Sequence, residues 1–141
     1  MNTKIKVLIA KVGLDGHDRG AILLTTALKE EGFETYYSGL RRTPEEIAGM
    51  AVLHQVDCVG LSSLCGAHTV WFPKVMAALQ AASWQGQLVI AGGIIPVEDE
   101  PALRKAGISE IFRPHSAIAD IASYIRNHVK AETFPPARKI M

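Results

Sequence analysis

The feature that most constrains the fold of this chain is a regular alternation of short apolar runs with longer segments of helical periodicity. The predicted strands span residues 4–10, 33–38, 56–61, 87–91 and 110–112. The predicted helices span residues 20–31, 44–54, 73–82, 98–106 and 117–129. Such alternation is typical of parallel strands that are joined by right-handed helical crossovers. We therefore expect a single layered α/β domain.

The number of strand–helix pairs limits the sheet topologies that the chain can adopt. Five strand–helix pairs are too few for a closed barrel, and they match the flavodoxin-like (Rossmann-type) doubly wound five-stranded parallel sheet with the order 2-1-3-4-5. The second helix carries the clearest start signal, because Thr43 is a suitable N-cap, Pro44 occupies the first helical position, and acidic residues follow in the first turn. Ligands of such sheets bind beyond the carboxyl ends of the strands.

Composition excludes several classes of protein. The chain has 141 residues, a net charge of +1 and 48% hydrophobic residues, which suit one globular domain and give no basic footprint for nucleic acid. We expect residues 1–130 to form the domain and residues 131–141 to form a C-terminal tail without periodicity. No apolar stretch reaches the ~20 residues of a membrane span and no signal region precedes the first strand, so we expect a cytoplasmic protein that does not bind membranes.

The loop after the first strand is polar and rich in glycine. A neutral imidazole such as that of His17 is a good ligand for a transition metal once a carboxylate fixes its tautomer. Asp15 is two residues away and suits that role, and Lys11 can pair with Asp15. The alternative reading is that Asp15 caps the first helix and that His17 is an exposed loop histidine.

Three motifs fall together at the expected strand ends. They are Asp15-x-His17-x-x-Gly20, Ser62-x-Leu64 and Gly92-Gly93. In this order they resemble the cobalamin-binding domains of mutases and of methionine synthase. The longer strings 11–21, 62–68 and 92–96 are similar to the cobalamin domain of methylmalonyl-CoA mutase and its relatives, and the resemblance covers residues 4 to about 128.

The resemblance implies a role for each matching residue. His17 is implied to be the lower axial ligand of cobalt, where it displaces the dimethylbenzimidazole of the cofactor, with Asp15 and Lys11 completing a hydrogen-bonded relay. Ser62 and Leu64 are implied to line a slot for the displaced nucleotide tail, and a glycine pair leaves room for it. The full implied cofactor-binding set is Lys11, Asp15, Gly16, His17, Asp18, Arg19, Gly20, Ser62, Leu64, Gly92 and Gly93.

Two regions leave alternatives open. The segment Arg113-Pro114-His115-Ser116 departs from the Gly-Pro-Gly-Thr-like segment common in the family, so Arg113 and His115 either obstruct the tail, contact its phosphate or close the slot. His68, before the predicted third helix, either faces the corrin ring or a partner subunit, or has a helix-capping or solvent role.

The resemblance also implies a function. The chain is similar to the small subunit of an adenosylcobalamin-dependent acyl-CoA mutase, an isomerase that catalyses a radical carbon-skeleton rearrangement. A separate large TIM-barrel subunit would bind the acyl-CoA, in a heterotetramer, and no catalytic residue is expected in this chain alone. The alternatives are a stand-alone cobalamin carrier, chaperone or sensor, and a corrinoid methyl carrier, although the latter usually has an N-terminal helical module. A receiver domain is disfavoured because the third strand ends in Gly60-Leu61-Ser62 and not in a phosphoacceptor Asp.

Overall fold

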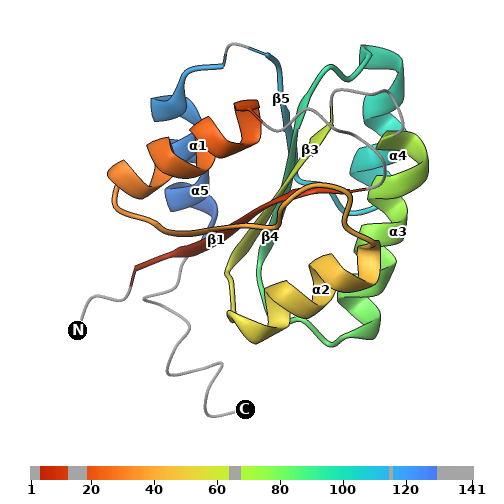
Figure 1. The fold of residues 1–141 in the computed structure, drawn as a ribbon. Coiled ribbons are helices and arrows are strands. Elements are labelled where there is room, and N and C mark those ends of the chain that lie inside the picture. The colour runs from red at the N-terminus through yellow and green to blue at the C-terminus, as the bar shows by residue number, and fades with distance from the viewer. Residues whose placement is uncertain (1–3, 13–18, 64–67, 115, 130–141) are drawn as a thin grey trace.

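The computed structural model describes residues 4–12, 19–63, 68–114 and 116–129. Its strands are β1 (Lys6–Lys11), β2 (Glu34–Tyr37), β3 (Cys58–Ser63), β4 (Leu88–Gly93) and β5 (Glu110–Phe112). Its helices are α1 (Arg19–Glu30), α2 (Pro44–Leu53), α3 (His68–Ala81), α4 (Glu100–Lys105) and α5 (Ile118–His128), with a short 3₁₀ turn, η1 (Val97–Asp99), before α4 (Figure 1).

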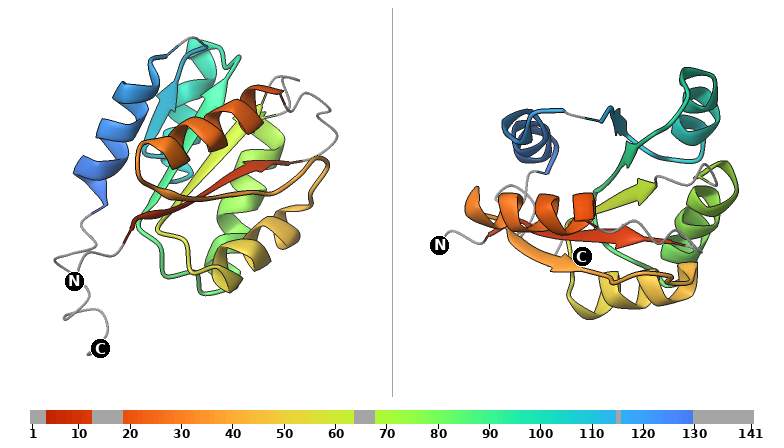
Figure 2. Two further views of the ribbon diagram at one scale, coloured as in Figure 1. Left: turned by 60° about the vertical axis from the view of Figure 1, so that its left-hand side comes forward. Right: turned by 45° about the horizontal axis from the view of Figure 1, so that its top comes forward.

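The five strands form one parallel sheet in the order β2-β1-β3-β4-β5. This confirms the predicted doubly wound topology. Helices α1 and α5 cover one face of the sheet, and α2, α3 and α4 cover the other face (Figures 1 and 2). All the carboxyl ends of the strands therefore meet at one edge, where the predicted motifs lie.

Each face of the sheet packs a separate hydrophobic core, because successive side chains of a strand point to opposite faces. Leu8, Val59 and Val89 belong to the core under α2 and α3. Their neighbours Val7, Cys58 and Leu88 belong to the core under α1 and α5. The central strands are thus buried on both sides, which explains their continuous apolar sequences.

The predicted start of the third helix is wrong. We predicted that it begins at Pro73, whereas α3 begins at His68 and contains Pro73. Buried residues recur along α3 at helical spacing as His68, Phe72, Val75 and Leu79. Burial of this stripe outweighs the backbone hydrogen bond that a proline near the start of a helix removes.

Strands β3 and β4 are also longer than predicted. The predicted ends were residues 61 and 91, but the strands continue to Ser63 and Gly93. The motifs Ser62-x-Leu64 and Gly92-Gly93 therefore begin inside the sheet and not in the loops that follow it. Helix α4 is shorter than predicted at both ends because η1 precedes it.

The start of α2 follows the prediction. The Thr43 hydroxyl accepts a hydrogen bond from the Glu46 backbone N–H (3.0 Å), and the Glu46 carboxylate accepts one from the Thr43 backbone N–H (2.9 Å). This capping box satisfies two N–H groups that a helix end leaves free. Across the parts of the chain that the structure describes, no helix combines the length and the apolar character needed to cross a membrane. The predicted tail, residues 131–141, lies outside the described residues.

Candidate functional site

Four strands place one residue each in a row along the carboxyl edge of the sheet. Lys11 pairs with Ser62, Ser62 pairs with Gly92, and Gly92 pairs with Phe112. Ser62 and Gly92 belong to separate motifs in the sequence, and Lys11 is the first residue of the string 11–21. The parallel register therefore brings the predicted site residues of β1, β3 and β4 side by side.

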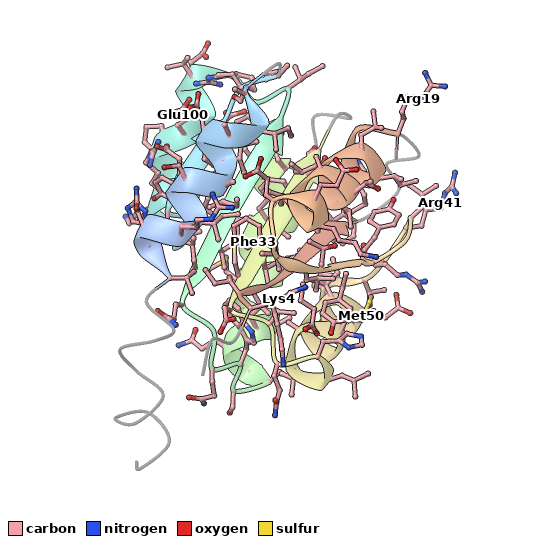
Figure 3. The ribbon with its side chains drawn as sticks, turned by 90° about the vertical axis from the view of Figure 1, so that its left-hand side faces the viewer. Lys4, Arg19, Phe33, Arg41, Met50 and Glu100 are labelled. Carbon is pink, nitrogen blue, oxygen red and sulfur yellow. The ribbon has the colours of Figure 1, made fainter. Side chains whose placement is uncertain are left out.

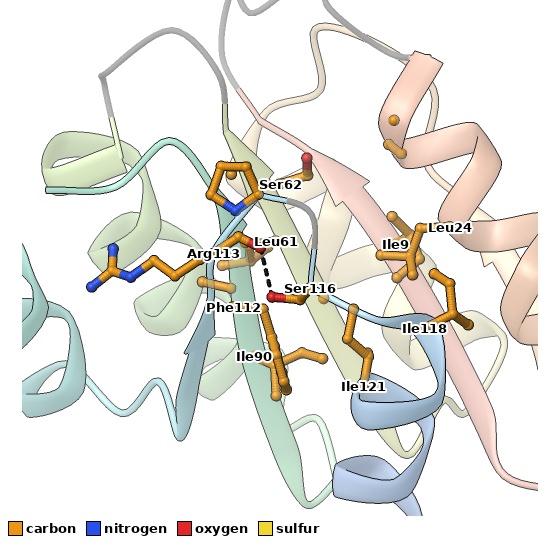
Figure 4. A pocket seen from close by; sticks show the side chains of 17 residues that line it. Ile9, Leu24, Leu61, Ser62, Ile90, Phe112, Arg113, Ser116, Ile118 and Ile121 are labelled. Carbon is orange, nitrogen blue, oxygen red and sulfur yellow. Dashed lines mark hydrogen bonds between the residues drawn. The ribbon is translucent and has the colours of Figure 1, made fainter.

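A cavity of about 400 Å³ opens beside this row, between the sheet and helices α1 and α5 (Figure 4). Its walls are mostly apolar. The lining residues come from β1, α1, β3, β4, the segment after β5, and α5: Ile9, Gly20, Ala21, Leu24, Gly60, Leu61, Ser62, Ile90, Ala91, Gly92, Gly93, Phe112, Arg113, Pro114, Ser116, Ile118 and Ile121. The predicted residues Gly20, Ser62, Gly92 and Gly93 thus share one cavity.

The cavity exists because the central strands carry small residues on this face. The small residues are Gly60 and Ser62 of β3 and Gly92 of β4. The neighbouring residues Val59 and Leu61 point to the opposite face and are larger. A Cβ atom at Gly60 would lie 2.9 Å from Ile9 Cδ1, so a side chain at this position would collide with Ile9, which also lines the cavity. We did not single out Gly60 from the sequence. Its signal was a glycine within a buried central strand, which often marks close approach of a ligand or backbone.

The two glycines at the end of β4 serve different purposes. A Cβ atom at Gly92 would meet only the Phe112 carbonyl oxygen, at an ordinary 3.6 Å, so the absence of a side chain there leaves room in the cavity. Gly93 has φ +118°, and a Cβ atom there would lie 1.9 Å from the Ser63 carbonyl oxygen. Gly93 is therefore required by the backbone itself. That a missing side chain leaves room for a ligand stays a prediction for Gly92.

Lys11 is completely buried at the end of β1. Its backbone N–H donates to the Ser38 hydroxyl (3.0 Å), and its carbonyl accepts from the Arg42 N–H (3.4 Å). Lysine is almost never fully buried unless its ammonium is paired. Lys11 is thus a buried cation in the row of residues at the carboxyl edge of the sheet.

The remaining predicted residues divide into two groups. Arg19 is exposed at the start of α1 and points away from the body of the molecule (Figure 3), and it does not line the cavity. Gly20, next to it, lines the cavity, and a Cβ atom there would meet nothing within 4 Å. The other predicted residues lie outside the described residues: Asp15, Gly16, His17, Asp18 and Leu64.

The structure narrows the alternatives for Arg113. Its guanidinium donates to the Ile95 carbonyl oxygen and forms an ion pair with Glu100, and in Figure 4 its side chain extends away from the other labelled lining residues. The guanidinium therefore does not fill the cavity. Ser116 closes the turn after β5, because its hydroxyl donates to the Arg113 carbonyl oxygen (2.6 Å). His115 lies outside the described residues.

His68 is buried, with 2% of its surface exposed, so a solvent role is excluded. Its Nε2 lies 2.8 Å from Asp99 Oδ2. Its Nδ1 is buried and has no hydrogen-bond partner among the residues that the structure describes. The pair joins the first residue of α3 to the last residue of η1.

Two titratable groups at the amino ends of strands, away from this edge, have shifted pKa values. Arg104 donates a hydrogen bond to Glu110 (2.6 Å), and this contact holds the pKa of the Glu110 carboxyl below its usual value. Burial raises the pKa of the Cys58 thiol far above its ordinary value, which makes this cysteine unreactive. Within the described ranges, no group of three or more His, Cys, Asp or Glu side chains is placed to hold a metal ion.

A doubly wound sheet with an apolar cavity at the switch between β1 and β3 defines a class of ligand-binding α/β domains. Residues 5–127 match the model of the B12-binding domain family. The chain belongs to this family.

Comparison with curated proteins gives two kinds of relative. The chain is 43% identical over 129 residues to the 2-hydroxyisobutanoyl-CoA mutase small subunit of Aquincola tertiaricarbonis, covering 92% of this chain and 95% of that protein. It is 37% identical over 121 residues to the pivalyl-CoA mutase small subunit of Xanthobacter autotrophicus, covering 86% of this chain and 81% of that protein. It is also 38% identical to the methylmalonyl-CoA mutase of Escherichia coli, covering 87% of this chain but only 18% of that protein.

Solved structures agree on the fold. A cobalamin-binding protein from Desulfitobacterium hafniense superposes with a TM-score of 0.74 at 24% identity, covering 89% of this chain and 59% of that one. The chemotaxis protein CheY4 of Vibrio cholerae gives a TM-score of 0.69 at 12% identity, covering 89% of this chain and 99% of that one. At such identities these likenesses show the doubly wound fold alone.

Proposed function

We propose that this chain is the small cobalamin-binding subunit of an adenosylcobalamin-dependent acyl-CoA mutase. The observation that carries the proposal is the apolar cavity at the carboxyl edge, whose walls include Gly20, Ser62 and Gly92 from three separate motifs. Membership of the B12-binding family supports the cofactor. The two mutase small subunits, which match this chain over most of their length, support the kind of enzyme.

The residues present fit a cobalamin nucleotide tail. The tail ends in a flat, mostly apolar base, and the cavity is a mostly apolar slot beside a sheet. Side chains at Gly20 and Gly92 would project into free space and occupy it. Arg113, the residue that was expected to disturb the fit, turns its guanidinium to Ile95 and Glu100 instead.

For the metal, we propose His17 as the lower axial ligand of cobalt. Asp15 would accept a hydrogen bond from the other ring nitrogen and so fix the tautomer. Lys11 would complete the relay, and its place supports this role because it is the last residue of β1, the strand that leads into the segment with Asp15 and His17. We further propose that Gly16, Asp18 and Leu64 contact the cofactor, and that Arg19 does so at the exposed rim.

When bound, adenosylcobalamin supplies the cobalt–carbon bond whose cleavage starts radical rearrangements. The contribution of this chain is to bind the nucleotide tail, to keep water from it and to orient an imidazole toward cobalt. None of the described residues is assigned a catalytic role, so the acyl-CoA and the reacting carbon atoms would be held by a partner.

We propose that this partner is a large TIM-barrel subunit in a heterotetramer. The names of the relatives as small subunits, and the match to only 18% of a methylmalonyl-CoA mutase, support a division of one enzyme between two chains. We also propose that the assembly works in the cytoplasm.

The test is reconstitution. The chain is mixed with a large mutase subunit from its source organism and with adenosylcobalamin, and conversion of branched acyl-CoA substrates is followed. The proposal predicts isomerisation that requires both chains and the cofactor. Cobalamin binding without a complex or activity would favour a stand-alone carrier, chaperone or sensor.

A further inference from the structure

The buried imidazole of His68 has one satisfied and one unsatisfied nitrogen. Nε2 contacts Asp99 Oδ2 at 2.8 Å, and Nδ1 is buried without a hydrogen-bond partner. A buried polar atom without a partner destabilises the fold, so such an atom needs an explanation. The site described above does not use it, since His68 does not line the cavity.

The contact with Asp99 determines which nitrogen carries a proton. A carboxylate only accepts hydrogen bonds, so Nε2–H donates to Asp99. In the neutral ring, Nδ1 therefore presents a lone pair, which is an acceptor for an N–H or O–H donor.

The pair lies at the edge where the cofactor is proposed to bind. His68 follows β3 and Asp99 follows β4, the two strands whose ends contribute Ser62 and Gly92 to the cavity. The Ile94 N–H donates to the Ser63 carbonyl (3.1 Å), which ties these two strand ends together. The Asp99 side chain is 32% exposed, so the pair lies just beneath the surface of this edge.

We propose that His68 Nδ1 accepts a hydrogen bond from a primary carboxamide at the periphery of the corrin ring, with Asp99 as the residue that fixes its tautomer. This rests on the proposed cobalamin function and adds a polar anchor on the α3 side of the edge. Primary amides ring the corrin, and each carries the N–H donor that Nδ1 lacks. Because Nδ1 is buried, the first turn of α3 must shift slightly to admit the amide.

The direct test is nitrogen NMR on the wild-type chain labelled with ¹⁵N-histidine. Before ligand is added, His68 should show a protonated Nε2 and a bare Nδ1 without a hydrogen bond. Saturation with diamagnetic adenosylcobalamin should move the Nδ1 resonance in the direction of hydrogen-bond acceptance, and the backbone amides of Thr69 and Val70 should shift with it. An unchanged Nδ1 resonance at saturation, or a doubly protonated ring, would overturn the inference.

Variants give a second readout through the Kd. His68→Gln keeps a donor near Asp99 but removes the acceptor at Nδ1, and it should weaken binding roughly three- to tenfold, the effect of one hydrogen bond. Asp99→Ala should weaken binding by a similar factor, whereas Glu98→Ala, a change of the neighbouring exposed acid in η1, should not. Equal Kd values for wild type, His68→Gln and Asp99→Ala would contradict the inference.

Cobinamide, which has the corrin amides but no nucleotide tail, separates this inference from the proposed function. The His68→Gln penalty should persist with cobinamide, because the amide contact does not involve the tail. Loss of the penalty with cobinamide would contradict the proposed amide contact while leaving cobalamin binding intact. Failure of the wild-type chain to bind adenosylcobalamin at all would instead contradict the cofactor itself and the inference with it.

Discussion

The two faces of the sheet differ most at the carboxyl edge, although the same strands build both. On the α2–α3–α4 face, large buried side chains such as Phe72, Leu61 and Ile47 pack together in one core. On the α1–α5 face, Gly60, Ser62 and Gly92 leave a cavity of about 400 Å³. At this edge, one face is therefore packed with large side chains, and the other gives up packing and leaves an open volume.

The alternation of large and small side chains along one strand can build a packed core on one face of the sheet and a cavity on the other. In β3 the successive residues Val59, Gly60, Leu61 and Ser62 alternate between large and small. The large residues point to the filled face and the small residues point to the hollow one. Substitutions on the two faces should consequently affect different measurements.

The largest effect on stability is expected from the filled face. Phe72 is fully buried in α3, so Phe72→Ala should lower the free energy of unfolding by about 3–5 kcal/mol, because it leaves a void. Ile121→Ala, on the hollow face, should cost about 2 kcal/mol, because this side chain already borders a cavity. Urea denaturation measures both, and equal losses would contradict the difference between the faces.

The adjacent glycines of β4 provide the second test. Gly93→Ala should destabilise the chain by about 3 kcal/mol, since it combines a positive φ with a clash against the Ser63 carbonyl. Gly92→Ala should change stability by less than about 1 kcal/mol. Thermal and urea unfolding of the two variants would decide this, and a stable Gly93→Ala variant would refute the assigned backbone role.

Filling the cavity should affect binding and leave the fold intact. Gly92→Leu should weaken adenosylcobalamin binding about a hundredfold, because the added side chain takes the volume of the nucleotide tail, an effect of about 2.7 kcal/mol. Isothermal titration gives the Kd, and the midpoint of unfolding serves as the control. Cobinamide binding should be unaffected, so an equal loss with both ligands would show that the cavity does not hold the tail.

The smallest effect is expected from exposed charges, which belong to neither core. Arg104 lowers the pKa of Glu110, so the folded state favours the carboxylate more than the unfolded state does. The contribution is fully present above the unfolded pKa and is lost as the pH falls through the folded pKa. Because the pair is partly exposed, we expect only a few tenths of a kcal/mol.

Comparison with Glu110→Gln isolates that contribution. The wild-type chain should lose its small advantage over this variant as the pH falls from about 6 to about 3. Urea midpoints at several pH values measure the difference. An advantage that grows in acid would show that the sign assigned to Glu110 is wrong.

The sequence predicted the sheet order from the alternation of strands and helices. It predicted the start of α2 from the local signal Thr43-Pro44. It failed at the start of α3, because we predicted Pro73 as the first helical residue, whereas burial of His68 and Phe72 extends the helix toward the N-terminus. It also missed Gly60 and the direction of the Arg113 side chain. Both depend on contacts between distant strands and helices, which residue spacing does not reveal.

We propose that this chain binds cobalamin with its own histidine on cobalt. Electron paramagnetic resonance of the chain mixed with cobalamin and reduced to Co(II) tests this proposal, with ¹⁵N-histidine labelling and His17→Ala as the control. Ligation by His17 predicts a nitrogen hyperfine pattern that changes with the label and disappears in His17→Ala. A pattern that is insensitive to the label, or that is identical in the two proteins, would contradict it.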